Sequence, residues 1–141
     1  MKRLSMLALV LGLSSCGRPP EEAPTSPPPV VLPQNYQSLS PAQVETLMKQ
    51  TKNLGILDTR QYDEMRNGLG WIPGSQSCSW LDGNQSKLQG LDRNQPWLVY
   101  CTIGGRAELT AQAMSKLGFK EVYLLKGGFA EWLAQGKAVV R

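Results

Sequence analysis

The fold is decided by one stretch of the sequence, Leu98-Val99-Tyr100-Cys101-Thr102-Ile103-Gly104-Gly105-Arg106. The apolar run 97–100 predicts a buried strand, and the residues after Arg106 have the spacing of a helix. A short loop with two glycines therefore joins a strand to the start of a helix. In such a loop successive N–H groups point inward, and the helix N-terminus adds a partial positive charge. The stretch predicts an anion-binding loop with Cys101 at its entrance.

Cys101 is the candidate nucleophile of this loop. The thiolate is the reactive form of a cysteine, and a positive field of this kind stabilises it. A purely structural cysteine at a strand end is the alternative, and the glycine loop closed by Arg106 argues against it.

Composition narrows the possible functions. The chain has 141 residues, enough for one domain, and a net charge of +4, to which Lys2 and Arg3 contribute at the extreme N-terminus. The other basic residues are scattered, so nucleic acid is not expected as a partner. Histidine is absent, which excludes a histidine base and makes a zinc site unexpected. The cysteines show no metal-ligand spacing, so neither a metal nor another cofactor is predicted.

Residues 1–15 have the pattern of an export signal. Lys2 and Arg3 precede the apolar segment 4–13, which is too short to remain in a bilayer as a spanning helix. The segment ends in Leu13-Ser14-Ser15-Cys16, which resembles the lipobox of bacterial lipoproteins. The resemblance implies cleavage before Cys16, lipidation of that cysteine and a location facing the periplasm or the cell surface. An ordinary secretory signal is the alternative.

Residues 16–34 are predicted to be a tether. Seven of the residues 17–34 are proline, and the segment has little to bury. An extended chain of this length would hold a domain tens of Å from the membrane, at about 3.1 Å per residue. A proline-rich ligand for a partner protein is the alternative interpretation.

The folded domain is expected over 35–141. Ser40 and Pro41 form a start signal for a helix over 41–50, with an apolar face of Val44, Leu47 and Met48. The other expected elements are strands over 54–57, 97–100 and 121–125, an extended piece near 78–81, and helices over 61–66, 107–117 and 129–134. The polar segment 83–95 gives no clear pattern. Alternating strands and helices predict an α/β fold, a mostly parallel central sheet covered by helices on both faces.

Five motifs resemble the single-domain rhodanese family, in order and at similar spacing. They are Leu57-Asp58-Thr59-Arg60, Trp71-Ile72-Pro73-Gly74-Ser75, the loop from Cys101 to Arg106, Gly118-Phe119 with Val122-Tyr123-Leu124, and Lys126-Gly127-Gly128-Phe129-Ala130-Glu131-Trp132. The resemblance covers the whole folded domain. It implies a rhodanese-like three-layer fold and a sulfurtransferase.

The resemblance also implies a mechanism. Cys101 would take the outer sulfur of thiosulfate or a persulfide and pass it to cyanide or a thiol. Backbone N–H groups of 102–106 would stabilise the anionic sulfur, and Gly104 and Gly105 would adopt angles closed to other residues. Arg106 either holds the loop or neutralises the donor. Four residues separate Cys101 from Arg106, whereas related phosphatases have five, so a phosphatase is disfavoured.

Four other residues have candidate roles. Asp58 and Arg60 are expected to form an internal ion pair that braces the loop, and Lys126 either attracts an anionic donor or is simply solvated. Cys78 is expected to be a buried structural cysteine. The family's usual histidine before Ile-Pro-Gly is Trp71 here. The uncharged Thr102 and Ile103 suggest that thiosulfate is a poor donor.

Two functions of other kinds stay open. A rhodanese fold can serve as a binding module without turnover, although members of that kind typically lack the loop cysteine. Thiol redox exchange between Cys101 and Cys78 is the second.

Overall fold

The computed structural model describes residues 35–141. The predicted export signal, the predicted lipidation site Cys16 and the predicted tether lie outside the described residues. Within residues 35–141, no helix is long and apolar enough to cross a membrane.

The described part of the chain forms a five-stranded sheet in which every pair is parallel. The strand order is β1 (Tyr36–Leu39), β5 (Val122–Leu125), β4 (Trp97–Tyr100), β2 (Gly55–Asp58) and β3 (Ser75–Ser77). All residues of β2 and β4 are buried. The predicted α/β class with a parallel sheet is confirmed.

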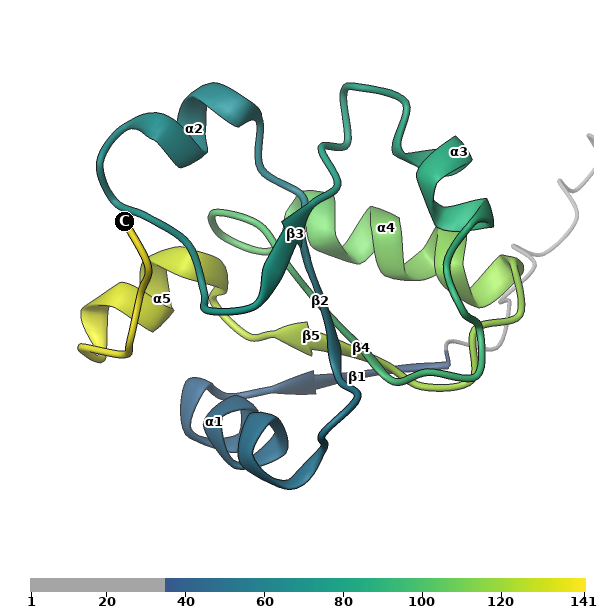
Figure 1. Cartoon of the computed structure of the whole chain (residues 1–141), viewed down its shortest axis with the longest axis horizontal. Coiled ribbons are helices and arrows are strands. Elements are labelled where there is room, and N and C mark those ends of the chain that lie inside the picture. The colour runs from purple at the N-terminus through teal and green to yellow at the C-terminus, as the bar shows by residue number, and fades with distance from the viewer. Residues whose placement is uncertain (1–34) are drawn as a thin grey trace, which may run out of the picture. The chain divides into compact units, whose positions relative to one another are not determined.

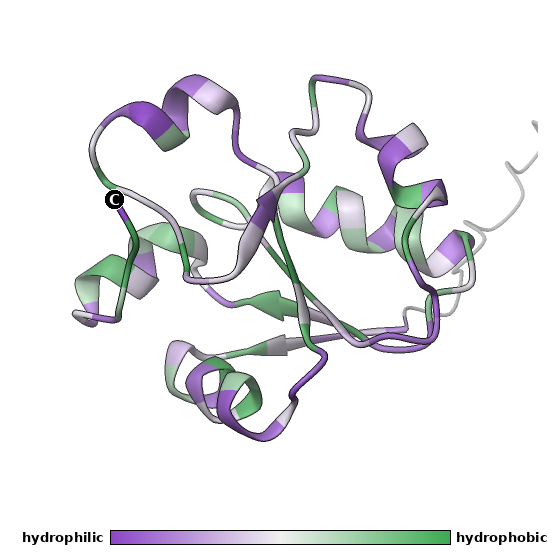
Figure 2. Cartoon of the chain, in the orientation of Figure 1, coloured by the Kyte–Doolittle hydropathy of each residue, from purple (hydrophilic) through white to green (hydrophobic). Residues whose placement is uncertain are grey.

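Helices cover both faces of the sheet (Figure 1). They are α1 (Pro41–Gln50), α2 (Tyr62–Arg66), α3 (Asn84–Gln89), α4 (Gly105–Lys116) and α5 (Gly128–Ala134). One apolar core joins the sheet to α3 and α4, and a second joins it to α1 and α5. Figure 2 shows hydrophobic residues gathered along β5 and on α5. The central strand β4 contributes to both cores, so its end is held rigidly in place.

Local sequence explains two of these elements. Ser40 caps α1 through a reciprocal pair of hydrogen bonds with Gln43, and Pro41 begins the helix. The first residue of β2 is a glycine, Gly55, because the ring of Trp97 covers this position. A Cβ at position 55 would lie 2.3 Å from that ring.

Several element predictions were wrong in detail. The extended piece expected near 78–81 is instead β3 at Ser75–Ser77, and the unassigned segment contains α3. The strand β1 was not predicted. Both edge strands are short and mostly polar, so their strand conformation comes from pairing with β5 and β2 rather than from an apolar pattern.

Candidate active site

Cys101 directly follows the central strand β4, and its loop runs into α4. A cavity of about 400 Å³ opens there. Its lining residues are Glu64, Cys101, Thr102, Ile103, Gly105 and Arg106. The cysteine is only 1% exposed, whereas Ile103 at the loop tip is 76% exposed. Only a slender group of a substrate can therefore reach the sulfur of Cys101.

The N–H of Gly104 donates a hydrogen bond to Sγ of Cys101 at 3.0 Å. Gly104 has a φ of 122°, a conformation that side chains rarely adopt. Gly105 does not have a positive φ, so the expectation that both glycines supply unusual angles was wrong for Gly105. A Cβ at position 105 would meet open space, and Gly105 instead forms part of the cavity wall.

The first turn of α5 supports the loop from behind. The N–H of Phe129 donates to the carbonyl of Cys101 at 2.8 Å, and that of Ala130 donates to the carbonyl of Thr102 at 3.0 Å. Gly128 lies so close that a Cβ there would be 2.6 Å from both carbonyl oxygens. These contacts explain why position 128 of the motif is a glycine. The carbonyl groups of Cys101 and Thr102 are fixed on one side of the loop, and the N–H of Gly104 faces the sulfur.

Arg106 is held by a carboxylate that the sequence reasoning missed. Its guanidinium forms an ion pair with Glu64, in which Nη2 donates to Oε1 at 2.7 Å, and Nη2 also donates to Thr102 Oγ1 at 3.0 Å. Thr102 Oγ1 in turn donates to Glu64 Oε1 at 2.8 Å. The hydrogen bond from Arg106 lowers the pKa of Glu64 to about 2, and Glu64 raises the pKa of Arg106. Arg106 contacts the loop through Thr102, and its interaction with the Cys101 side chain also raises its pKa.

A signal for Glu64 was present in the sequence. Gln61 and Glu64 have capping-box spacing, and the N–H of Gln61 donates to Glu64 Oε2 at 2.9 Å. The spacing marks the start of α2 but not the position of this helix beside the cysteine loop, which depends on contacts distant in sequence.

Asp58 and Arg60 form the expected internal ion pair, 2.6 Å between Nη2 and Oδ2, and both are buried. The hydroxyl of Tyr100 donates to Asp58 Oδ2 at 2.7 Å, and Arg60 also donates to the carbonyl of Gly70 at 2.8 Å. Burial acts to lower the pKa of Arg60, but the contact with Asp58 outweighs it and the pKa is raised. Burial, followed by the negative charge of Asp58, raises the pKa of Tyr100. The pair contacts Tyr100, the residue before Cys101, and the guanidinium of Arg60 lies 3.9 Å from the centre of the Phe129 ring.

The remaining predicted residues lie around the loop or behind it. Lys126 is exposed and lines a second hollow, of about 240 Å³, together with Ile103 and Gly104. Cys78 is buried in the same apolar core as Cys101, and burial raises the pKa of its thiol. Both described cysteines are free thiols. Within residues 35–141, no group of acidic or cysteine side chains could hold a metal ion.

Comparison with known sequences gives the same picture. Residues 40–135 match the family described as Rhodanese-like domain. The chain is 32% identical over 103 residues to thiosulfate sulfurtransferase GlpE of Coxiella burnetii strain RSA 331, a match that covers 70% of this chain and 89% of that protein.

Some relatives have tRNA in their names. A tRNA sulfurtransferase of Desulfurococcus amylolyticus is 37% identical over 79 residues, and a tRNA uridine(34) hydroxylase of Protochlamydia amoebophila is 33% identical over 112. The matches cover 56% and 73% of this chain but only 15% and 34% of those proteins. These names count weakly against the expectation that nucleic acid is no partner.

Solved structures share the fold. A rhodanese-related protein from Thermoplasma volcanium is 26% identical with a TM-score of 0.64, covering 74% of this chain and 98% of that one. A polysulfide-sulfur transferase homodimer from Wolinella succinogenes is 28% identical with a TM-score of 0.62, covering 75% and 79%. The chain belongs to the rhodanese-like domain family.

Proposed function

We propose that this protein is a sulfurtransferase that carries a sulfane sulfur as a persulfide on Cys101. The observation that carries the proposal is the position of Sγ, at the base of a cavity and 3.0 Å from the N–H of Gly104. A hydrogen-bond donor that points at this sulfur stabilises the negative charge of the thiolate and of the persulfide that replaces it. The sulfurtransferases among the relatives support the same reaction class.

The reaction consists of two balanced steps. The thiolate of Cys101 attacks the outer sulfur of the donor; the new S–S bond forms on Cys101 while the donor's own S–S bond breaks. Thiosulfate leaves as sulfite, and a persulfide leaves as a thiolate. A cyanide or thiolate acceptor then attacks the outer sulfur and releases the Cys101 thiolate, giving thiocyanate or a new persulfide.

The charges favour a persulfide of an organic thiol as the donor over thiosulfate. Thiosulfate is a dianion, but the charge of Arg106 is balanced by Glu64. The loop tip instead presents Ile103, an exposed apolar side chain. A persulfide has a slender terminal sulfur that fits the narrow access to Cys101, and its apolar body would contact Ile103.

Intact-mass measurement of the full chain tests the reaction. After incubation with glutathione persulfide, we expect a gain of about 32 Da that cyanide removes. Cys101→Ser should show no gain, and Cys78→Ser is the matched control that should keep it. A gain that persists in Cys101→Ser contradicts the mechanism. No gain with either persulfide or thiosulfate would favour a binding module, and loss of the gain in Cys78→Ser would favour thiol redox exchange.

We also propose that the protein is an exported lipoprotein anchored through Cys16 and facing the periplasm or the cell surface. The proposal is supported by the lipobox-like Leu13-Ser14-Ser15-Cys16 after a basic and apolar segment. Metabolic labelling with a radioactive fatty acid should mark the wild-type chain but not Cys16→Ser. Equal labelling of both chains would contradict this anchor.

A further inference from the structure

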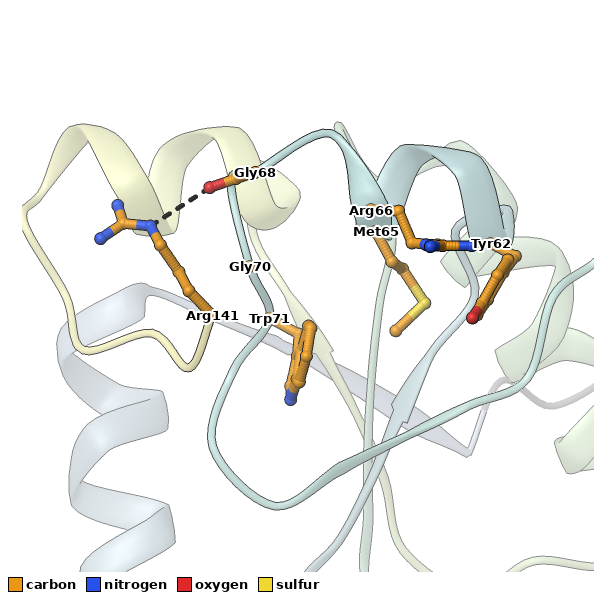
Figure 3. A pocket seen from close by; sticks show the side chains of 7 residues that line it. All are labelled: Tyr62, Met65, Arg66, Gly68, Gly70, Trp71 and Arg141. Atoms are coloured by element: carbon orange, nitrogen blue, oxygen red, sulfur yellow. Dashed lines mark hydrogen bonds between the residues drawn. The ribbon is translucent and has the colours of Figure 1, made fainter.

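A further hollow, of about 400 Å³, is lined by α2, the segment that follows it and Arg141 (Figure 3). Its lining residues are Tyr62, Met65, Arg66, Gly68, Gly70, Trp71 and Arg141. The reaction at Cys101 uses none of them. The volume is within the range of about 300–1,000 Å³ that is common for small-molecule sites.

The walls of the hollow are apolar and aromatic. Met65 from α2 and the indole of Trp71 point toward one another across it, and Tyr62 forms its outer end (Figure 3). The backbone of Trp71 is fixed by two hydrogen bonds with Val140, of 3.0 and 2.9 Å. Tyr62 is 59% exposed and Trp71 is partly exposed. These walls offer a flat apolar group the aromatic surfaces of Trp71, whose backbone is fixed, and of Tyr62.

Two arginines line the hollow from opposite ends: Arg66 extends beside Tyr62, and the guanidinium of Arg141 points away from Trp71 (Figure 3). The guanidinium of Arg66 lies 5.2 Å from the centre of the Tyr62 ring, and Nε of Arg141 donates to the carbonyl of Gly68 at 3.2 Å. No carboxylate side chain lines the hollow. The ion pairs found within residues 35–141 use Arg60, Arg106 and Lys137 instead. The guanidinium groups therefore keep N–H donors that can bind an anion.

We propose that this hollow is a binding site for a small organic anion with a flat, apolar body. The body would lie between Trp71 and Met65, and its carboxylate or sulfonate would bind Arg66 at the Tyr62 end of the hollow. The geometry also connects the site to the cysteine loop. Tyr62, Met65 and Arg66 face the hollow, whereas Glu64 on the other side of the same helix holds Arg106.

The test is a titration of the full chain with naphthalene-2-sulfonate, followed by NMR of ¹⁵N-labelled tryptophan indole groups. We expect a saturable shift of the Trp71 indole, while the indoles of the buried Trp97 and Trp132 stay in place. Trp71→Ala should weaken binding at least tenfold. Met65→Ala, which leaves the backbone bridge at Trp71 untouched, should weaken it severalfold.

The charge requirement has its own test. Arg66→Gln should weaken binding of the sulfonate at least fivefold and leave binding of the neutral 2-naphthylmethanol nearly unchanged. Arg93→Gln is the matched control, because Arg93 is exposed and does not line the hollow. Circular dichroism melting would verify that each variant is folded. Shifts that do not saturate, or binding that survives both Met65→Ala and Arg66→Gln, would overturn the proposal.

Discussion

Glu64 and Arg106 face one another at the mouth of the cysteine loop, with Nη2 of the arginine 2.7 Å from Oε1 of the carboxylate. The pair joins α2 to α4, two helices that no other ion pair within residues 35–141 connects. It holds the arginine beside Cys101 while removing most of its net charge. Glu64 is therefore a positioning residue that also sets the charge seen by a sulfur donor.

Glu64→Gln should change the preference between donors. Without the carboxylate, Arg106 presents an unbalanced positive charge. This charge attracts thiosulfate, whose negative charge is concentrated next to the reacting sulfur, more than glutathione persulfide, whose carboxylates are remote from it. The ratio of kcat/KM for thiosulfate to that for glutathione persulfide should rise about threefold to tenfold, the size of one added Coulomb interaction that is screened by water. Steady-state kinetics with both donors would measure it.

The matched control is Glu45→Gln. Glu45 pairs with Lys137, 2.7 Å away, and does not line the active-site cavity. This variant should leave the donor ratio unchanged. A ratio that falls in Glu64→Gln, or that rises equally in the control, would contradict the assigned role of Glu64.

The same ion pair should contribute to stability in a pH-dependent way. The pKa of Glu64 is about 2 in the folded protein against an ordinary value of 4.5, so its charge stabilises the fold above pH 4.5. This contribution should disappear as the pH falls from 4.5 toward 2. Both side chains are partly exposed, which limits the effect to no more than about 1 kcal/mol. Urea unfolding of wild type and Glu64→Gln should show a difference at pH 7 that shrinks at pH 3; a constant difference would exclude the mechanism.

Removing Arg60 should be much more damaging, because its partner is fully buried. Arg60→Met would leave Asp58 without its cation and the carbonyl of Gly70 without its donor. Breaking a buried pair in this way costs about 3–5 kcal/mol. Thermal melting should show a fall in Tm of more than about 10 °C. Lys137→Met breaks the more exposed pair and should cost no more than about 1 kcal/mol. Equal losses in the two variants would show that Arg60 does not support the fold as argued.

The central part of the fold and site could be predicted because its signals are local. The run Trp97–Tyr100, the cysteine, the two glycines and the following helix are adjacent in sequence, and Asp58 and Arg60 are two residues apart. The five motifs, which include the cysteine, the two glycines, Asp58 and Arg60, then indicated the rhodanese family.

What could not be predicted depends on contacts that are distant in sequence. Glu64 meets Arg106 across 42 residues, and nothing in its neighbourhood indicates that α2 lies over the loop. The edge strand β3 consists of Ser75-Gln76-Ser77, which has no apolar side to signal a strand. The helix α3 buries only Asn84 and Leu88, too few residues for a clear periodic pattern.

The two loop glycines should respond differently to alanine. Gly104→Ala forces a side chain into a φ of 122°, which costs about 1–3 kcal/mol and moves the N–H away from the Cys101 sulfur. Gly105→Ala meets no neighbouring atom and begins a helix, so stability should be unchanged or slightly higher. Its methyl group would nevertheless stand in the wall shared by the two hollows beside the loop, and KM for the donor should rise. Urea unfolding together with the rate of the mass gain on Cys101 separates the two effects. If both variants lost stability equally, Gly105 would be needed for its backbone and not for the space that it leaves open.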